Sequence, residues 1–235
     1  MGGVPVLELE GVRIEQGDFA LSADLTVPGG AIVAVLGPSG AGKSTLLGAV
    51  AGFVPLAGGA IRWDGADLGP LPPGRRPLSI LFQDNNLFPH LTVAQNVGLG
   101  LRPDLRLDTT DRARVAAALA RVGLEGLEER RPAALSGGQQ SRVALARVLL
   151  RDRPLLLLDE PFAALGPALR HEMLAEVRTL AAETGATVLM VSHEPRDAQA
   201  VADSVILVAE GRAAPPVPTA TILADPPPAL RAYLG

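Results

Sequence analysis

The sequence contains no cysteine. This absence excludes a disulfide framework and thiolate-bound zinc or iron–sulfur sites, and it fits a reducing compartment. The chain also lacks a basic excess, because its formal net charge is −4 at pH 7. A protein that grips a nucleic-acid strand needs positive charge against the phosphates. We therefore expect no nucleic-acid partner.

Long hydrophobic runs are absent as well. The apolar runs at 31–36, 155–158 and 187–191 are far shorter than the roughly 20 residues that cross a bilayer as a helix. The N-terminal residues show no basic stretch followed by an apolar one, so no secretory signal is predicted. We expect no membrane-spanning segment in this chain.

What the sequence does contain is an alternation of short apolar runs with stretches of helical period. This pattern is typical of an α/β fold in which helices cover both faces of a largely parallel sheet. Residues 6–27 instead indicate an antiparallel portion, with turns expected at Glu10-Gly11 and Gln16-Gly17-Asp18, and a second strand pair is expected to turn at Asp64-Gly65. Buried strands are predicted at 31–36, 78–82, 155–159, 187–192 and 204–208.

A helical insertion is predicted between the second and third of these strands. Residues 83–141 contain no convincing strand but do contain a helical stretch at about 110–122. We therefore expect a helical subdomain at 83–141 within a core made of residues 1–82 and 142–235. The tail after Gly211 is rich in proline and has too few periodic residues for another domain.

A glycine-rich loop follows the strand predicted at 31–36 and begins a helix. Its glycines let backbone N–H groups turn toward phosphate oxygens, and the helix N-terminus adds a partial positive charge. Lys43 would reach the β- and γ-phosphates, and the Ser44 hydroxyl would ligate Mg²⁺. The loop predicts nucleotide binding but does not by itself separate a kinase, a GTPase and a transport ATPase. Its residues are Gly37, Pro38, Ser39, Gly40, Ala41, Gly42, Lys43 and Ser44, followed by Thr45.

Two carboxylates stand at the end of the strand predicted at 155–159. In α/β folds phosphates bind at the carboxyl edge of the sheet, and Asp159 and Glu160 would lie there. Asp159 would hold Mg²⁺, directly or through water. Glu160 is then the candidate general base for the attacking water.

A second phosphate-binding helix start is predicted at Leu135-Ser136-Gly137-Gly138-Gln139, just before a helical run at 141–150. With this motif, the loop at 37–44 and the acidic pair, the sequence resembles the ABC ATPase family over nearly its whole length. The resemblance implies one ABC ATPase domain over residues 1–235, in which a P-loop NTPase core carries an antiparallel β portion and the helical subdomain. It also implies ATP and Mg²⁺ as cofactors.

The resemblance further implies how the motifs cooperate. In this family two ATPase domains pair head to tail, so Ser136, Gly137, Gly138 and Gln139 would bind the ATP held by the partner's loop. Gln83 is similar to the family's glutamine that contacts Mg²⁺ and the water, and His193 resembles its switch histidine. The implied catalytic set is Glu160, His193, Gln83 and Lys43, and the implied metal ligands are Ser44, Gln83 and Asp159.

The chain departs from the family pattern at two places. No aromatic residue occupies the position that usually stacks on adenine, where Glu15 or Gln16 stands, so we expect weak stacking unless Phe19 substitutes. The loop after Glu160 ends in Gly166 instead of the family's aspartate, which puts the coupling between the two ATP sites in doubt. Nucleotide binding and hydrolysis are still expected.

Three functions are compatible with an ABC ATPase: an importer motor, the ATPase of an exporter, and a non-transport role. The chain lacks the coiled-coil arms, tandem domains and basic surfaces of non-transport members, and residues 87–93 resemble importer subunits. The segments at 71–88 and 93–101 are most similar to ATPase subunits of thiamine importers, although ferric-ion, polyamine, sulfate and molybdate importers share several of their elements. This resemblance implies a homodimer bound to a membrane permease at the cytoplasmic face of the cell membrane, and indirectly an external substrate-binding protein.

Overall fold

Five parallel strands at the centre of the fold position the functional loops. The computed structural model describes residues 6–234, and its sheet has the strand order β5-β4-β1-β2-β10-β9-β3-β8-β7-β6, with β11 paired to β9. The five predicted buried strands are confirmed to within one residue at each end. They are β3 (Ile32–Leu36), β6 (Leu78–Leu81), β7 (Leu155–Asp159), β8 (Thr187–Val191) and β9 (Ser204–Ala209).

Burial on both faces explains why these strands are continuously apolar. Every residue of β3, β7 and β8 is buried. Leu155 and Leu157 pack on the side of α1 (Lys43–Ala51), whereas Leu156 and Leu158 pack on the side of α5 (Pro167–Thr184). A parallel sheet covered by helices on both faces needs apolar residues at every position of its inner strands.

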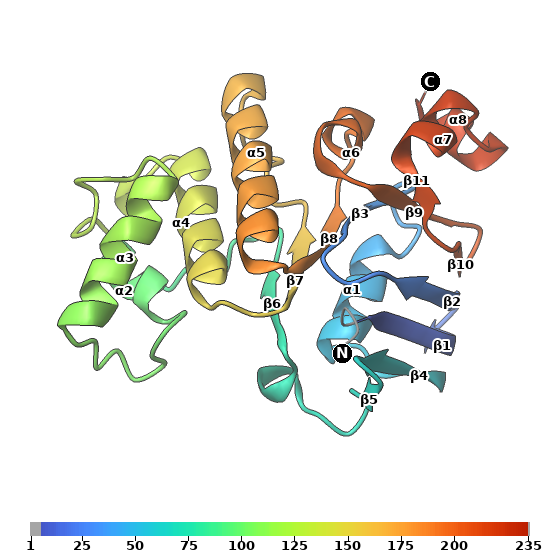
Figure 1. The fold of residues 1–235 in the computed structure, drawn as a ribbon, viewed down its shortest axis with the longest axis horizontal. Coiled ribbons are helices and arrows are strands. Elements are labelled where there is room, and N and C mark those ends of the chain that lie inside the picture. Colours follow the sequence, from blue (N-terminus) through green and yellow to red (C-terminus); the bar gives the residue numbers. More distant parts are fainter. Residues whose placement is uncertain (1–5, 235) are drawn as a thin grey trace.

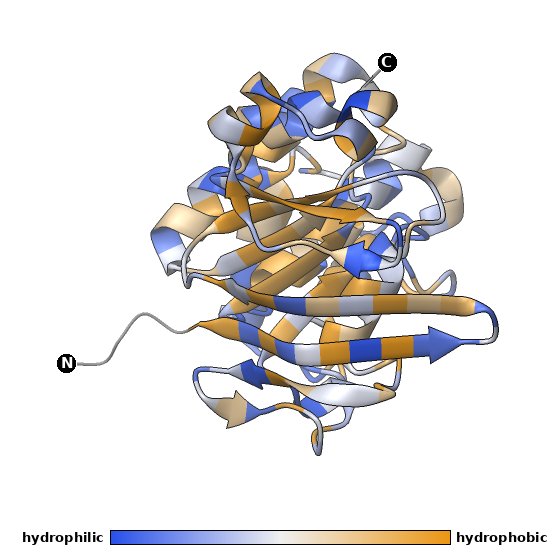
Figure 2. Ribbon diagram, turned by 90° about the vertical axis from the view of Figure 1, so that its right-hand side faces the viewer, coloured by the Kyte–Doolittle hydropathy of each residue, from blue (hydrophilic) through white to orange (hydrophobic). Residues whose placement is uncertain are grey.

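The antiparallel portion consists of β1 (Leu7–Gln16), β2 (Phe19–Val27), β4 (Gly58–Trp63) and β5 (Ala66–Asp67). The turns predicted at 16–18 and 64–65 are confirmed. The turn predicted at Glu10-Gly11 is wrong, because β1 continues through these residues and its register with β2 shifts between Leu9 and Val12. A β-bulge of this kind places glycine inside a strand. Figure 2 shows the alternating hydrophobic and hydrophilic residues along this long strand pair.

The helical region forms a lobe to one side of the sheet (Figure 1). It contains α2 (Val93–Gly98), α3 (Thr109–Arg121) and α4 (Gly137–Leu150), and the first two pack against α4. Short 3₁₀ turns lie at Pro73–Arg75 and Pro132–Ala134. The α4 helix runs unbroken through position 141, where the subdomain boundary was predicted.

The tail after Gly211 joins the same fold. It comprises β10 (Arg212–Ala213), β11 (Val217–Pro218), α7 (Thr219–Ala224) and α8 (Pro228–Leu234). Ile222 and Leu230 pack with Ala198 of α6 (Pro195–Val201) and with Leu36. None of the helices within residues 6–234 has both the length and the apolar character needed to cross a membrane.

Asn96 holds the start of the helical lobe. Its side chain is fully buried and accepts a hydrogen bond from the Phe88 N–H at 2.8 Å. Its amide group donates to the carbonyl oxygens of Phe88, Leu91 and Thr92 at 3.0–3.3 Å. These bonds tie the irregular loop at 88–92 to α2. The carbonyl oxygens of Phe88 and Thr92 also accept backbone N–H groups, those of Leu91 and Asn96, so the Phe88 N–H and the Leu91 carbonyl oxygen depend most on Asn96.

Replacing Asn96 with alanine is therefore expected to lower the free energy of unfolding by about 2–4 kcal/mol, because a fully buried side chain and its four hydrogen bonds to the loop backbone are lost. Urea denaturation measures this change. Gln95→Ala is the control, since Gln95 is exposed and its side chain accepts only the Thr92 N–H of the helix cap, and its loss should cost less than about 1 kcal/mol. Equal losses in the two variants would contradict the role given to Asn96.

Candidate active site

Parallel pairing brings the predicted motifs to one edge of the sheet. β3 pairs with β8, β8 with β7, and β7 with β6, all parallel, so the loops after their carboxyl ends emerge together. The loop at 37–44 follows β3, Glu160 follows β7, and His193 follows β8 with one residue between. Gln83 stands two residues beyond β6, exposed at the same edge.

The loop at 37–44 is shaped by close backbone approaches. A Cβ at Gly37 would lie 2.0 Å from the Val208 carbonyl oxygen, and one at Gly42 would lie 2.5 Å from the ring of Phe19. Both glycines also have positive φ angles, of 149° and 100°, which side chains rarely adopt. The loop therefore requires glycine at these two positions.

Lys43 is the first residue of α1, near the end of this loop, and is buried. Its ammonium donates to the carbonyl oxygens of Gly37 at 2.8 Å and Pro38 at 2.9 Å. Burial lowers the pKa of Lys43, while the nearby carboxylates of Glu160 and Asp159 act in the opposite direction. A phosphate oxygen would be a stronger acceptor for this ammonium than either carbonyl, because it carries a charge.

Ser44 and Asp159 meet next to Lys43. The Ser44 hydroxyl donates to Asp159 Oδ1 at 2.9 Å, although the two residues are 115 positions apart. The pKa of Asp159 is raised, chiefly by burial and also by the negative charge of Glu160. The hydrogen bond from Ser44 and the positive charge of Lys43 oppose this shift. A hydroxyl and a carboxylate side by side are hard oxygen donors of the type that Mg²⁺ prefers. These two residues fit such an ion.

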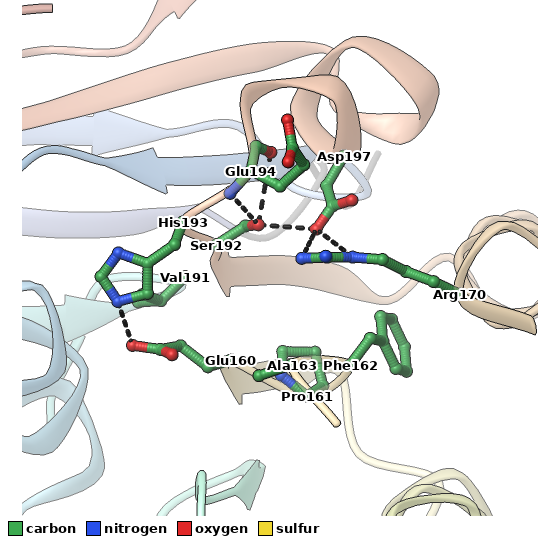
Figure 3. A pocket seen from close by; sticks show the side chains of 10 residues that line it. All are labelled: Glu160, Pro161, Phe162, Ala163, Arg170, Val191, Ser192, His193, Glu194 and Asp197. Atoms are coloured by element: carbon green, nitrogen blue, oxygen red, sulfur yellow. Dashed lines mark hydrogen bonds and ion pairs between the residues drawn. The ribbon is translucent and has the colours of Figure 1, made fainter. Parts of the chain in front are cut away.

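Glu160 and His193 face each other across the edge of the sheet (Figure 3). His193 Nε2 lies 2.5 Å from Glu160 Oε1. The Glu160 N–H donates to the Val191 carbonyl oxygen at 3.2 Å, so the backbone that leaves β7 is bonded to the end of β8. Glu160 has a positive φ of 48°, a strained conformation that is concentrated at functional sites.

A buried polar network fixes the loop that carries His193 (Figure 3). Ser192 Oγ donates to Asp197 Oδ2 at 2.6 Å and accepts from the Glu194 N–H at 3.0 Å. Arg170 of α5 donates to the same carboxylate oxygen through Nε at 3.1 Å and Nη2 at 2.8 Å. This network and the Glu160–His193 pair line a cavity of about 220 Å³.

Ser192, Asp197 and Arg170 were not predicted from the sequence as site residues. The only local signal is a serine at the strand end followed by an aspartate in the first turn of the next helix, which is common in proteins of many kinds. Arg170 lies 27 residues away from Asp197, and no local pattern links the two.

The motif at 135–139 begins α4, as predicted. Ser136 is the N-cap, accepting from the Gln139 N–H at 3.2 Å, and Gln139 Oε1 accepts from the Ser136 N–H at 2.9 Å. Ser136 and Gly137 are exposed. Figure 1 shows α4 in the helical lobe, with α5 between it and α1 in this view. Within one chain, the structure does not bring this motif to the loop at 37–44.

The two departures from the family pattern have a clear structural setting. Phe19 is half-buried, and its ring lies against Gly42 of the phosphate-binding loop. Gln16 is its cross-strand partner. Gly166 is the N-cap of α5, and a Cβ there would meet nothing within 4 Å. The fold would thus accommodate a carboxylate at position 166.

A glycine-rich phosphate loop, an adjacent Ser–Asp pair, and a Glu–His pair at the carboxyl edge of a parallel sheet define a P-loop nucleoside triphosphatase. Residues 21–163 match the family model described as ABC transporter, and the chain belongs to this family. The predicted α/β fold is thereby confirmed, and the chain is an ATPase of the ABC type that binds ATP.

Similar proteins share nearly the full length of the chain. The Thiamine import ATP-binding protein ThiQ of Cereibacter sphaeroides is 65% identical over 98% of this chain and 100% of its own length. The protein of the same name from Ruegeria sp. is 60% identical over the same shares. Among solved structures, the dimeric post-hydrolysis state of the ATP-binding cassette MJ0796 bound to ADP and Pi has a TM-score of 0.80 and 28% identity. The alignment spans 91% of this chain and 98% of the MJ0796 chain.

The polar network beneath His193 is expected to matter for turnover. Asp197→Asn keeps the shape of the side chain but removes the charge that Arg170 and Ser192 contact. We expect kcat for ATP hydrolysis to fall about tenfold and the free energy of unfolding to fall by about 1–2 kcal/mol, a range reduced because Arg170 is partly exposed. Steady-state ATPase assays and urea denaturation measure the two effects.

Glu176→Gln is the matched control, because Glu176 is also a carboxylate paired with an arginine, Arg121, but lies elsewhere on α5. Its kcat should equal that of the wild type. If both variants hydrolyse ATP at the same rate, the network does not support the loop that carries His193.

The position of Phe19 predicts that its ring contributes to nucleotide binding. Phe19→Ala should weaken ATP binding about tenfold, because stacking on an aromatic ring contributes about 1–3 kcal/mol. Every base has a π-face, so ATP and GTP should bind with similar affinities. Equilibrium binding of both nucleotides tests this, with Gln16→Ala as the control that keeps wild-type affinity. A strong preference for ATP would contradict this prediction.

Proposed function

We propose that this chain is the ATP-hydrolysing subunit of a thiamine importer, acting as a head-to-tail homodimer that closes on two ATP molecules and drives a separate membrane permease. The observation that carries the proposal is the convergence of Lys43, the Ser44–Asp159 pair and the Glu160–His193 pair at one sheet edge. The proposed cargo rests on curated relatives that carry the thiamine import name and match nearly the full chain.

Binding of ATP would rely on the loop at 37–44. Its backbone N–H groups and the N-terminus of α1 attract the phosphates, and Lys43 exchanges its carbonyl partners for phosphate oxygens. Ser44 and Asp159, together with Gln83, would hold Mg²⁺, which supplies positive charge against the β- and γ-phosphates. Asp159 is already oriented by Ser44, so the two oxygens need little rearrangement.

Hydrolysis would rely on Glu160 and His193. When Nε2 carries its proton, His193 donates to one Glu160 oxygen, which leaves the second oxygen to accept a proton from the attacking water. His193 is partly exposed. To donate to the γ-phosphate at the same time, its ring would also need a proton on Nδ1, because a neutral imidazole has one N–H. Glu160 would then be the general base and His193 the residue that orients it.

Two copies of the chain would complete each site. Ser136 and Gly137 are exposed at the start of α4, where the helix N-terminus favours an anion. Their separation from the loop at 37–44 of the same chain requires that any shared phosphate be bound between two chains. The dimeric MJ0796 structure supports this arrangement. Dimer closure would then depend on a phosphate that hydrolysis removes.

The permease would bind beside Gln83. Phe53 and Phe88 are the exposed large hydrophobic residues of the described chain, at 55% and 46%. Phe53 packs edge-on against Phe82, which precedes Gln83, with ring centroids 5.4 Å apart. Exposed aromatic rings next to a site residue fit an apolar helix of a partner protein.

The chain would thus lie at the cytoplasmic face of the cell membrane as a peripheral subunit, with the external substrate-binding protein contacting only the permease.

Uptake of labelled solutes in source cells tests the proposal. Lys43→Ala should abolish thiamine uptake because it removes the ammonium group that binds the phosphates of ATP. Glu160→Gln should abolish it because ATP binds but is not hydrolysed. The control is Glu125→Gln, an exposed carboxylate in the helical lobe, which should transport normally. Purified Glu160→Gln protein should also form a stable dimer with ATP in size-exclusion chromatography.

Ferric ion, putrescine, sulfate and molybdate are measured alongside thiamine. Loss of one of these solutes instead of thiamine would keep the motor and replace the cargo. Unchanged uptake of all five in both variants would reject the importer and favour an exporter or a non-transport role.

A further inference from the structure

The sole tyrosine of the sequence contacts the loop that carries His193. Tyr233 lies on α8, and its hydroxyl donates a hydrogen bond to the backbone carbonyl oxygen of His193, 40 residues earlier. The proline-rich tail therefore reaches the candidate active site. Neither the fold family nor the proposed function accounts for this contact.

The segment that carries Tyr233 is firmly attached to the sheet. Leu230 of α8 is fully buried against Ala34 and Val205. Upstream, the Thr219 hydroxyl donates to the Ala202 carbonyl oxygen at 2.7 Å, and β11 pairs with β9. These anchors hold α8 against the strands and the helix that flank the His193 loop, so the position of the tyrosine is set by the core.

The surroundings of the hydroxyl favour its role as a donor. Burial raises the pKa of Tyr233, and the negative charges of Glu194, Glu160 and Asp197 raise it further. The phenol therefore keeps its proton at neutral pH. A phenolic donor bound to a backbone carbonyl fixes the orientation of the peptide group that joins His193 to Glu194.

His193 is thus held at three points. Its imidazole contacts Glu160, the neighbouring Ser192–Asp197 bond holds one side of its backbone, and Tyr233 holds its carbonyl group on the other. Without the tyrosine hydroxyl, this peptide group would lose one of its constraints. The imidazole would then spend less time oriented toward Glu160.

We propose that Tyr233 is a positioning residue for His193, through which the C-terminal segment sets the rate of ATP hydrolysis. The inference rests on the proposed roles of Glu160 and His193. Tyr233 does not contact the reacting atoms; it acts by limiting the orientations of the His193 backbone.

Tyr233→Phe removes the hydroxyl alone and keeps the ring that packs beside α6. We expect kcat for ATP hydrolysis to fall roughly threefold to tenfold, as for loss of one hydrogen bond, while KM for ATP and the thermal midpoint stay close to wild type. The matched control is Thr219→Val, which removes another hydroxyl-to-carbonyl bond of the same segment without touching the His193 loop. Its kcat should be unchanged.

The double variant with His193→Ala separates positioning from a general structural effect. In single-turnover assays with protein in excess, Tyr233→Phe should add no further loss once the imidazole is absent. An unchanged kcat in Tyr233→Phe, an equal fold loss with and without the imidazole, or the same loss in Thr219→Val would each overturn the proposal. Full activity of His193→Ala and Glu160→Gln would instead reject the proposed site, whatever Tyr233→Phe does.

Discussion

The parallel pairing of β7 with β8 is the constraint on which the site depends. Asp159 lies opposite Val191 in this pairing, and the Glu160 N–H bonds to the Val191 carbonyl oxygen. The residues that follow each strand therefore emerge side by side, and Glu160 meets His193. β3 lies on the other side of β8 and delivers the phosphate-binding loop to the same edge. A change of register between these strands would separate Glu160 from His193 and Ser44 from Asp159.

The site is built at the expense of local stability. It holds a buried lysine, a buried aspartate whose pKa is raised by burial, and a glutamate with a positive φ. Burying a charged side chain and holding a non-glycine residue at a positive φ angle both cost free energy. Such groups persist because the surrounding strands are fully buried and fix the loop ends. ATP and Mg²⁺ would add the opposite charges that these side chains are placed to meet.

The regions around the site connect it to the rest of the molecule. Arg170 and Asp197 join the helix after the Glu160 loop to the helix after the His193 loop. α8 also reaches the His193 loop, through the hydroxyl of Tyr233. The motif at 135–139 faces outward, where a second copy would meet it. In the proposed dimer, each chain would thus contribute its loop at 37–44 to one ATP site and its motif at 135–139 to the other.

The sequence by itself determined the local chemistry. The glycine loop, the acidic pair at a strand end and the buried strands depend on neighbouring residues, so their patterns predicted them to within a residue or two. The β-bulge at Glu10-Gly11 was predicted as a turn, because the bulge arises from pairing with β2. A glycine in a turn and a glycine in a bulge look the same in the sequence. Only the tertiary structure decided that Arg170 meets Asp197, that Phe19 lies on Gly42, and that Tyr233 reaches His193. These contacts join segments that the sheet and its helices bring together, and no periodicity in the chain records which distant residues will face each other.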